Sequence, residues 1–182
     1  ATSSGTISFG LVSIPVKLYA ASKSKALRFN MLHETDHSRL KQKLVCNECG
    51  DDVERSETVK GYEYSRGQYV VLSEEEIRSV ETKNDKSIEI EEFIPLAQVD
   101  PIFFDKSNLL GPDKGGAKAY TLLADAMRAS GKAAIGRYST RGRQALVLLR
   151  ATDDGLVMHG LLYADEVRSH GDVDMGDEVA FK

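Results

Sequence analysis

Residues 7–19 decide the fold; they read Ile7-Ser8-Phe9-Gly10-Leu11-Val12-Ser13-Ile14-Pro15-Val16-Lys17-Leu18-Tyr19. Apolar residues alternate with small or polar ones from Ile7 to Leu11, and Ile14, Val16 and Leu18 resume the alternation after a turn. A period of two is typical of a half-buried β-strand. Pro15 favours an edge position or the start of a strand, because proline has no N–H to donate to a ladder. The chain therefore begins with β-structure.

The pattern continues along the chain. Ala145-Leu146-Val147-Leu148-Leu149 is apolar on both faces, which predicts a central buried strand. Alternation and turn residues predict the other strands at about 39–45, 59–64, 68–72, 87–94, 132–140, 143–151 and 156–163. Helices are expected at about 73–80, where Ser73 and Glu76 suit a capping box, and at 118–128, where apolar residues share one side. Residues 95–117, with three prolines, are expected to be irregular.

The expected fold class is α+β and dominated by strands: a β-barrel core with a long excursion. The core should span residues 1–168, with the excursion inserted at about 30–72. Residues 169–182 should form an acidic tail or the truncated start of a C-terminal arm. A chain of 182 residues is long enough for one ordinary domain, or for one domain with a small inserted module.

Composition restricts the class of protein. No apolar run approaches the roughly 20 residues that a membrane-spanning helix needs. No secretory leader opens the chain, and its two cysteines, three positions apart, do not form a disulfide scaffold. These features favour a soluble protein of the reducing cytoplasm. No P-loop, nucleophile elbow, H-E-x-x-H or dinucleotide fingerprint is present, and His159 and His170 are isolated, so no catalytic residues are predicted.

The net charge of −4 hides a segregated pattern. Residues 1–45 carry seven Lys or Arg against two acids, and residues 107–150 carry eight against two. Residues 46–106 carry sixteen acids against seven basic residues, and residues 151–182 carry eight against two. Because recognition depends on local potential, a fold that gathers the basic segments on one surface would attract phosphate. The alternative is that these blocks are simply solvated surface.

Three basic clusters are candidates for phosphate contacts. Arg39, Lys41 and Lys43 alternate, so on one strand they would share a face and span roughly 13 Å, the reach of two or three phosphates. Few Asn or Gln accompany the basic residues, which disfavours reading of base sequence. The candidates are Lys17, Lys23, Lys25, Arg28, Arg39, Lys41, Lys43, Lys60, Arg66, Arg137, Arg141 and Arg143. A rival interpretation is a single-strand binder in which Tyr19, Tyr62, Tyr64 and Tyr69 stack on bases.

Cys46-Asn47-Glu48-Cys49, followed by Gly50, is one half of a zinc knuckle. A structural site needs four ligands, and His33 and Asp36, with His37 as an alternative, are the nearest upstream candidates. One structural zinc per chain is therefore one hypothesis, and free or redox-active cysteines are the other. A metal-dependent enzyme is a third, which would need an open coordination position and a nearby base.

Several stretches resemble the Ku proteins of bacteria. These stretches are residues 7–19, Val59-Lys60-Gly61-Tyr62-Glu63-Tyr64 with residues 69–77, Ile90-Glu91-Glu92-Phe93-Ile94 with Val99-Asp100-Pro101, and the 118–128 helix with residues 132–137. The resemblance runs from about residue 6 to 168. Some family members carry a zinc-ribbon-like excursion with a His-x-x-Cys pair before the CxxC. This chain matches at His33, Cys46 and Cys49 and departs at Asp36.

The resemblance implies a function. Ku-like chains are non-enzymatic; bacterial ones form homodimeric rings that thread onto duplex DNA ends without reading sequence, in non-homologous end joining. They protect ends and recruit a multidomain ATP-dependent ligase. The partners implied are thus double-stranded DNA ends, a second copy and that ligase, at the bacterial nucleoid. The excursion, with Arg39, Lys41, Lys43, Lys60 and Arg66, would be the arch over DNA. Longer homologues continue into a helical arm and a Lys-rich tail, and this chain ends before both.

Overall fold

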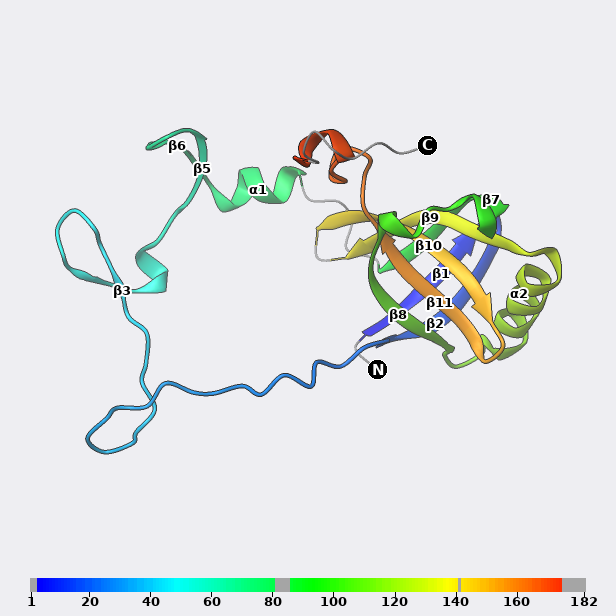
Figure 1. Ribbon diagram of the computed structural model, residues 1–182, viewed down its shortest axis with the longest axis horizontal. Helices are drawn as coiled ribbons and strands as arrows, with labels where there is room; N and C mark the ends of the chain where they lie inside the picture. The colour runs from blue at the N-terminus through cyan, green and yellow to red at the C-terminus, as the bar shows by residue number, and fades with distance from the viewer. Residues whose placement is uncertain (1–2, 81–85, 141, 175–182) are drawn as a thin grey trace. The chain divides into compact units, whose positions relative to one another are not determined.

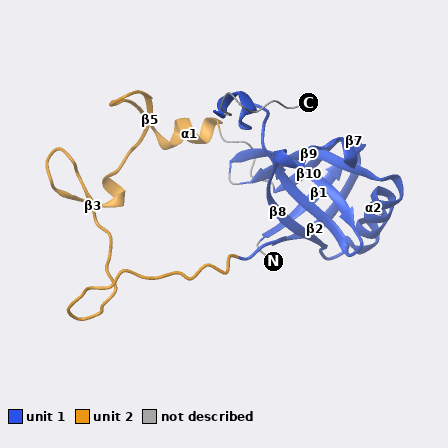
Figure 2. Cartoon of the chain, viewed as in Figure 1, with its two compact units in different colours: residues 1–23, 82–182 blue, residues 24–81 orange. Residues whose placement is uncertain are grey.

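The computed structural model describes residues 3–80, 86–140 and 142–174. It divides the chain into two compact units, residues 1–23 with 82–182 and residues 24–81 (Figure 2). The first unit is the barrel and the second is called the excursion below. The excursion therefore starts earlier and ends later than the 30–72 inferred from the sequence. Among the described residues, no helix is long and apolar enough to cross a membrane.

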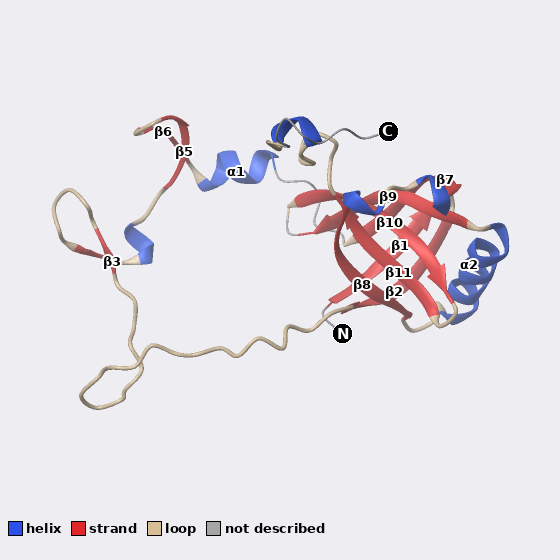
Figure 3. Cartoon of the chain, in the orientation of Figure 1, coloured by secondary structure: helices blue, strands red, loops and turns tan. Residues whose placement is uncertain are grey.

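Seven strands close the barrel in the order β1-β2-β8-β11-β10-β9-β7 (Figures 1 and 3). Their bounds are β1 Ser3–Phe9, β2 Val12–Ala20, β7 Ser87–Pro95, β8 Phe104–Pro112, β9 Lys132–Thr140, β10 Arg143–Thr152 and β11 Gly155–Leu161. Neighbouring strands are antiparallel except β1 and β7, which are parallel. The predicted strand-dominated barrel is confirmed. The alternation in residues 7–19 is its cause, because Ile7, Ile14 and Val16 are almost fully buried inside.

Helix α2, Ala117–Ser130, lies against one end of the barrel (Figure 1). Its Tyr120, Leu123 and Met127 belong to the same buried cluster as the strand residues. The Tyr120 hydroxyl donates to the Leu110 carbonyl of β8 at 2.6 Å and accepts from the Leu156 amide of β11 at 2.8 Å. This single buried hydroxyl thus satisfies two backbone groups on neighbouring strands. Gly131, at φ 66°, ends the helix in the left-handed conformation that favours glycine.

The irregular segment predicted at 95–117 is wrong in part. Three residues of short 3-10 helix occur at Leu96–Gln98 and three at Pro101–Phe103, but β8 follows and pairs with both β2 and β11. Its polar centre, Asp105 to Asn108, and its closing Gly111-Pro112 resemble a loop in sequence. Pairing on both sides, which comes from residues about 50 and 90 positions away, supplies the stability that local propensity does not indicate.

The excursion holds short elements: β3 Leu44–Val45, β4 Asp52–Val53, a 3-10 turn at Arg55–Glu57, β5 Lys60–Ser65, β6 Gln68–Leu72 and α1 Glu74–Val80. The predicted hairpin at 59–72 is confirmed by the β5–β6 ladder. The capping box before α1 is confirmed too, since Glu76 N–H donates to Ser73 Oγ and Ser73 N–H to Glu76 Oε2. In the C-terminal segment, His170–Asp172 forms a 3-10 turn.

The strand predicted over residues 39–45 is wrong. Arg39 forms an isolated bridge with Leu32, residues 40–43 have no regular structure, and β3 covers two residues only. An alternating pattern makes a strand only where a neighbouring strand accepts its hydrogen bonds. The Leu40 amide donates to the Met31 carbonyl at 3.4 Å, but no strand pairs with residues 41–43 in the described chain. The shared strand face proposed for Arg39, Lys41 and Lys43 is therefore not formed in this structure.

Candidate nucleic-acid interface

Two of the candidate cations on the barrel have carboxylate partners. Lys17 on β2 lies 3.4 Å from Asp113, and Arg137 on β9 donates from Nε to Glu91 of β7 at 2.7 Å. The pKa of Asp113 is lowered, first because the Lys114 amide donates to it and then through Lys17, so the pair is held in its charged form. A phosphate would have to compete with these carboxylates. Lys17 and Arg137 are accordingly weak candidates for phosphate binding.

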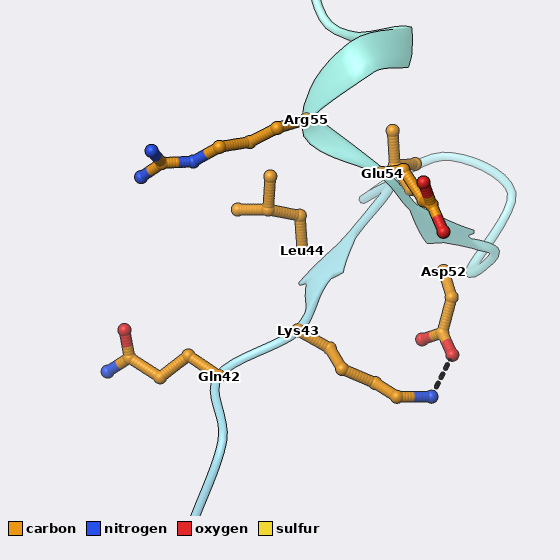
Figure 4. A pocket seen from close by; sticks show the side chains of 7 residues that line it. Gln42, Lys43, Leu44, Asp52, Glu54 and Arg55 are labelled. Atoms are coloured by element: carbon orange, nitrogen blue, oxygen red, sulfur yellow. Dashed lines mark hydrogen bonds and ion pairs between the residues drawn. The ribbon is translucent and has the colours of Figure 1, made fainter.

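A further cation is paired within the excursion. Lys43 forms an ion pair with Asp52 across the β3–β4 turn, and Figure 4 shows the two side chains meeting. Arg39 instead donates from Nη2 to the neutral Asn30 amide oxygen at 2.7 Å, which keeps its charge uncompensated. Of the predicted row of three, Lys43 has a carboxylate partner, whereas Arg39 and Lys41 have none within the described residues.

The other candidates are exposed, and within the described residues no carboxylate lies in ion-pair range of them. They are Lys23, Lys25, Arg28, Lys41, Lys60, Arg66 and Arg143. Arg141 lies outside the described residues. Four of the uncompensated cations, with Arg39, come from residues 23–41, a stretch that carries only two acids, one of which, Asp36, is hydrogen bonded to His33. This basic stretch, defined here as residues 23–41, is the most concentrated phosphate-attracting segment of the described chain.

Arg55 is a cation that the sequence interpretation missed. It lies in the 3-10 turn after β4 and lines two hollows of the excursion, one of about 600 Å³ with Gln42 and Leu44 (Figure 4), the other of about 520 Å³ with Lys60 and Leu72. The net charge of residues 46–106 did not indicate Arg55, because that segment as a whole is strongly acidic. Its exposure and its place in the lining of both hollows, rather than local composition, identify it as a further positive charge.

The predicted metal ligands fall into two separate pairs. His33 Nδ1 lies 3.0 Å from Asp36 Oδ1, and the same carboxylate oxygen accepts from the Ser38 amide at 3.0 Å. These bonds lower the pKa of Asp36, the Ser38 amide contributing most. Asp36 is thus engaged in orienting His33, whose Nε2 is left for a ligand, which is the arrangement of a supporting carboxylate rather than a fourth metal ligand.

Cys46 and Cys49 lie on the turn between β3 and β4. The Gly50 amide donates to the Cys46 carbonyl at 2.9 Å, and Gly50 itself has φ 77°. Amide groups of Cys49 and Glu48 donate to the Cys46 sulfur and lower the pKa of that thiol, which favours the thiolate that binds metal. The donor types fit zinc, but nowhere in residues 3–80, 86–140 and 142–174 do three potential ligands gather. His37, with φ 55°, occupies the turn beside the first pair.

The basic residues are dispersed along the chain, an arrangement suited to contacts with phosphates and not with base edges. Comparison with known proteins identifies the relationship: the family described as "Ku70/Ku80 beta-barrel domain" matches residues 8–180. The chain belongs to the Ku family. This confirms the resemblance that the sequence motifs indicated, and it agrees with the closed β-barrel of the structure.

Three proteins, each named as a non-homologous end joining protein Ku, show the similarity. The one from Bacillus subtilis is 44% identical over 93% of this chain and 55% of its own length. The one from Archaeoglobus fulgidus is 45% identical over 93% of this chain and 67% of its own. The one from Symbiobacterium thermophilum is 48% identical over 90% of this chain and 41% of its own. This chain thus spans roughly half of the curated relatives' length.

Proposed function

We propose that this chain binds the ends of double-stranded DNA without reading their sequence, as one half of a two-chain clamp, in non-homologous end joining. Membership of the Ku family and the names of its relatives support the pathway. The observation that carries the binding role is the basic stretch 23–41, whose exposed cations lack carboxylate partners in the described chain. Cations of this kind contact phosphates, and phosphates are the same whatever the base sequence.

A closed clamp reconciles an acidic chain with DNA binding, because only the surface that meets DNA needs to be basic. Topology then selects ends, since a closed ring loads only where a duplex terminates. The role is one of binding and not of catalysis. Recruitment of an ATP-dependent repair ligase is part of the same proposal. The residues that contact the ligase need not lie in this chain, which spans about half of its relatives' length.

The test compares a linear duplex with a covalently closed circle of the same sequence. We expect tight binding to the linear form, weak binding to the circle, and a steep loss of affinity with salt through counterion release. A single-stranded oligonucleotide of equal length serves as a third competitor, because stacking by the exposed Tyr62, Tyr64 and Tyr69 would favour it. Equal binding to circle and linear DNA rejects the clamp, and preference for the single strand favours the rival interpretation.

We also propose that Cys46 and Cys49 hold a structural zinc together with His33 and a fourth ligand, Asp36 or His37, which would have to be brought to the cysteine pair when the metal binds. The lowered pKa of Cys46 and the Asp36 carboxylate on His33 support this proposal. Metal analysis of the purified chain should give about one zinc per chain by the ligand count of a single site. Cys46→Ser should lose the metal while the barrel still melts at the wild-type temperature, because the turn lies outside the barrel core. A chain that retains its metal without Cys46 contradicts the assignment.

A further inference from the structure

A row of three polar residues lies across neighbouring strands of the barrel. Arg150 of β10 donates from Nε to Nε2 of His159 in β11 at 2.9 Å, and Nδ1 of the same ring lies 2.7 Å from Ser107 Oγ in β8. Phe104 stacks on the His159 ring, with 4.7 Å between the ring centroids. Leu149, next to Arg150, belongs to the core cluster inside the barrel. Because successive side chains of a strand point to opposite faces, the row lies on the outer face of the barrel.

The charge of Arg150 has no counter-ion within the described part of the chain. There, no carboxylate lies in ion-pair range of its guanidinium, and His159 is its one hydrogen-bond partner. The exposed Asp105 of β8 forms no ion pair with it. By contrast, Arg128 of α2 forms an ion pair with Asp125. Arg150 therefore keeps its full charge, and its Nη1 and Nη2 groups have no partner among the described residues.

A neutral histidine orients Arg150 in a way that a carboxylate cannot. A carboxylate at the position of His159 would orient the guanidinium and neutralise it at the same time, as Asp125 does for Arg128. The His159 ring engages only Nε, so the charge and the terminal N–H donors of Arg150 are left for a second partner. Arg150 is half-buried, and a charge that is partly removed from water is costly without a counter-ion. The geometry is that of a cation oriented to receive an anion.

The position of the row favours a phosphate of DNA over a carboxylate of another protein. The Ala21 amide donates to the Ser107 carbonyl at 3.1 Å, so the chain that leaves β2 passes beside the row. Lys23, the first cation of the basic stretch, follows two residues later and is exposed. The row thus adjoins the point where the basic stretch begins, and a duplex that this stretch attracts reaches the same surface.

We propose that Arg150 binds a phosphate of the DNA backbone and that His159 is its positioning residue. In this arrangement the terminal N–H groups of Arg150 donate to phosphate oxygens, a pairing that suits the flat fork of the guanidinium. The contact adds affinity and no sequence preference, because the phosphate does not change with the base. The inference rests on the duplex binding of the proposed function. It adds to that function a barrel residue that is absent from the candidates indicated by the sequence.

The first measurement is the salt dependence of binding to a linear duplex, for the wild type, Arg150→Gln, Arg150→Lys and the control Arg128→Gln. Arg150→Gln should reduce the slope by about one counterion for each chain and weaken binding about three- to tenfold at moderate salt. Arg150→Lys keeps the charge and therefore the slope, but it lacks the Nε–H that His159 accepts and should weaken binding about threefold. The guanidinium of Arg128 is engaged by Asp125 and by the Thr152 carbonyl, so the control should bind within about twofold of the wild type.

The second measurement tests the positioning role of His159. His159→Gln keeps an acceptor oxygen for the Nε–H of Arg150 and should bind the duplex within about twofold of the wild type. His159→Leu removes the acceptor and should lose affinity as Arg150→Lys does, with the slope retained. Thermal melting of each variant separates loss of the fold from loss of the contact. Should His159→Leu fail to fold, the two Arg150 variants and His159→Gln still decide.

Two results overturn the inference: wild-type slope and affinity in Arg150→Gln, or a folded His159→Gln protein that binds as weakly as Arg150→Gln. The linear-versus-circular DNA comparison is read separately. Equal binding to both DNAs with an Arg150-dependent slope refutes the clamp and leaves the phosphate contact in place. Preference for linear DNA without any effect of Arg150→Gln refutes the contact and leaves the clamp. A wild type that binds no duplex refutes both.

Discussion

The barrel and the excursion contain the same kinds of apolar residue but differ in what those residues contact. In the barrel, Ile7, Leu148 and Leu149 are fully buried among their neighbours. In the excursion, Phe29 and Val59 are 89% and 73% exposed. The difference shows that the barrel is stabilised by a core of its own, whereas residues 24–80 of the excursion contain no buried residue. Stability should therefore depend on residues of the barrel core and binding on residues outside it.

The largest expected effect is the loss of stability caused by a substitution in the barrel core. Leu149→Ala in β10 removes a fully buried side chain and should lower the free energy of unfolding by about 2–5 kcal/mol. Val71→Ala in β6, 61% exposed, should change it by less than about 0.5 kcal/mol when the chain is monomeric. Urea unfolding followed by circular dichroism, at low protein concentration, measures both. Similar losses in the two variants would mean that the excursion contributes to the fold of the single chain.

The second prediction compares two Tyr→Phe substitutions, each of which removes a side-chain hydroxyl, by their effect on the free energy of unfolding. Tyr120→Phe leaves the Leu110 carbonyl and the Leu156 amide without their buried partner and should cost about 1–3 kcal/mol. Tyr62→Phe, in the exposed hairpin, should cost little, because water replaces its hydroxyl contacts. The same unfolding measurement applies. A costly Tyr62→Phe in the monomer would place the hairpin inside a cooperative core.

The two regions also differ in how far sequence alone predicts them. Strand β10 was predictable because Val147, Leu148 and Leu149 form a continuous apolar run that is buried, and Gly155 marks the turn before β11. Strand β8 was not, because its polar centre is held by pairing with distant strands. In the candidate site, the basic residues were visible in sequence, but the ion pairs of Lys17, Lys43 and Arg137 were not, since each partner is set by folding.

A third effect concerns these ion pairs and DNA binding. Lys25→Gln with Lys41→Gln removes two cations that lack carboxylate partners, whereas Lys17→Gln with Arg137→Gln removes two that have them. The first double variant should reduce the salt dependence of binding to a linear duplex by about two counterions and weaken binding roughly tenfold at moderate salt. The second double variant, Lys17→Gln with Arg137→Gln, should change the salt dependence of binding much less. Because both lose two charges, equal slopes would show that net charge, and not the basic stretch, governs binding.

The smallest effect is a pH dependence that belongs to the barrel alone. His159 of β11 is almost buried, stacks on Phe104, accepts from Arg150 Nε at Nε2 over 2.9 Å, and contacts Ser107 Oγ through Nδ1 at 2.7 Å. Burial first, and the Arg150 charge second, lower the pKa of His159. Arg150 can only donate, so Nε2 must be unprotonated and Nδ1–H is left to donate to Ser107. The folded barrel therefore holds this histidine neutral.

The sign of the effect follows from that neutral state. Below the unfolded pKa of about 6.5, the unfolded chain binds a proton that the folded barrel resists, so stability should fall as the pH drops through that value. One titrating group cannot change the unfolding free energy by more than about 1.4 kcal/mol per pH unit, and partial exposure reduces this change further. Unfolding free energies at pH 7.5 and pH 5.5 for wild type and His159→Gln should converge at the lower pH. His37→Gln, in the excursion, should keep the wild-type difference in unfolding free energy between pH 7.5 and pH 5.5. If it removed that difference, the pH dependence would not belong to the barrel alone.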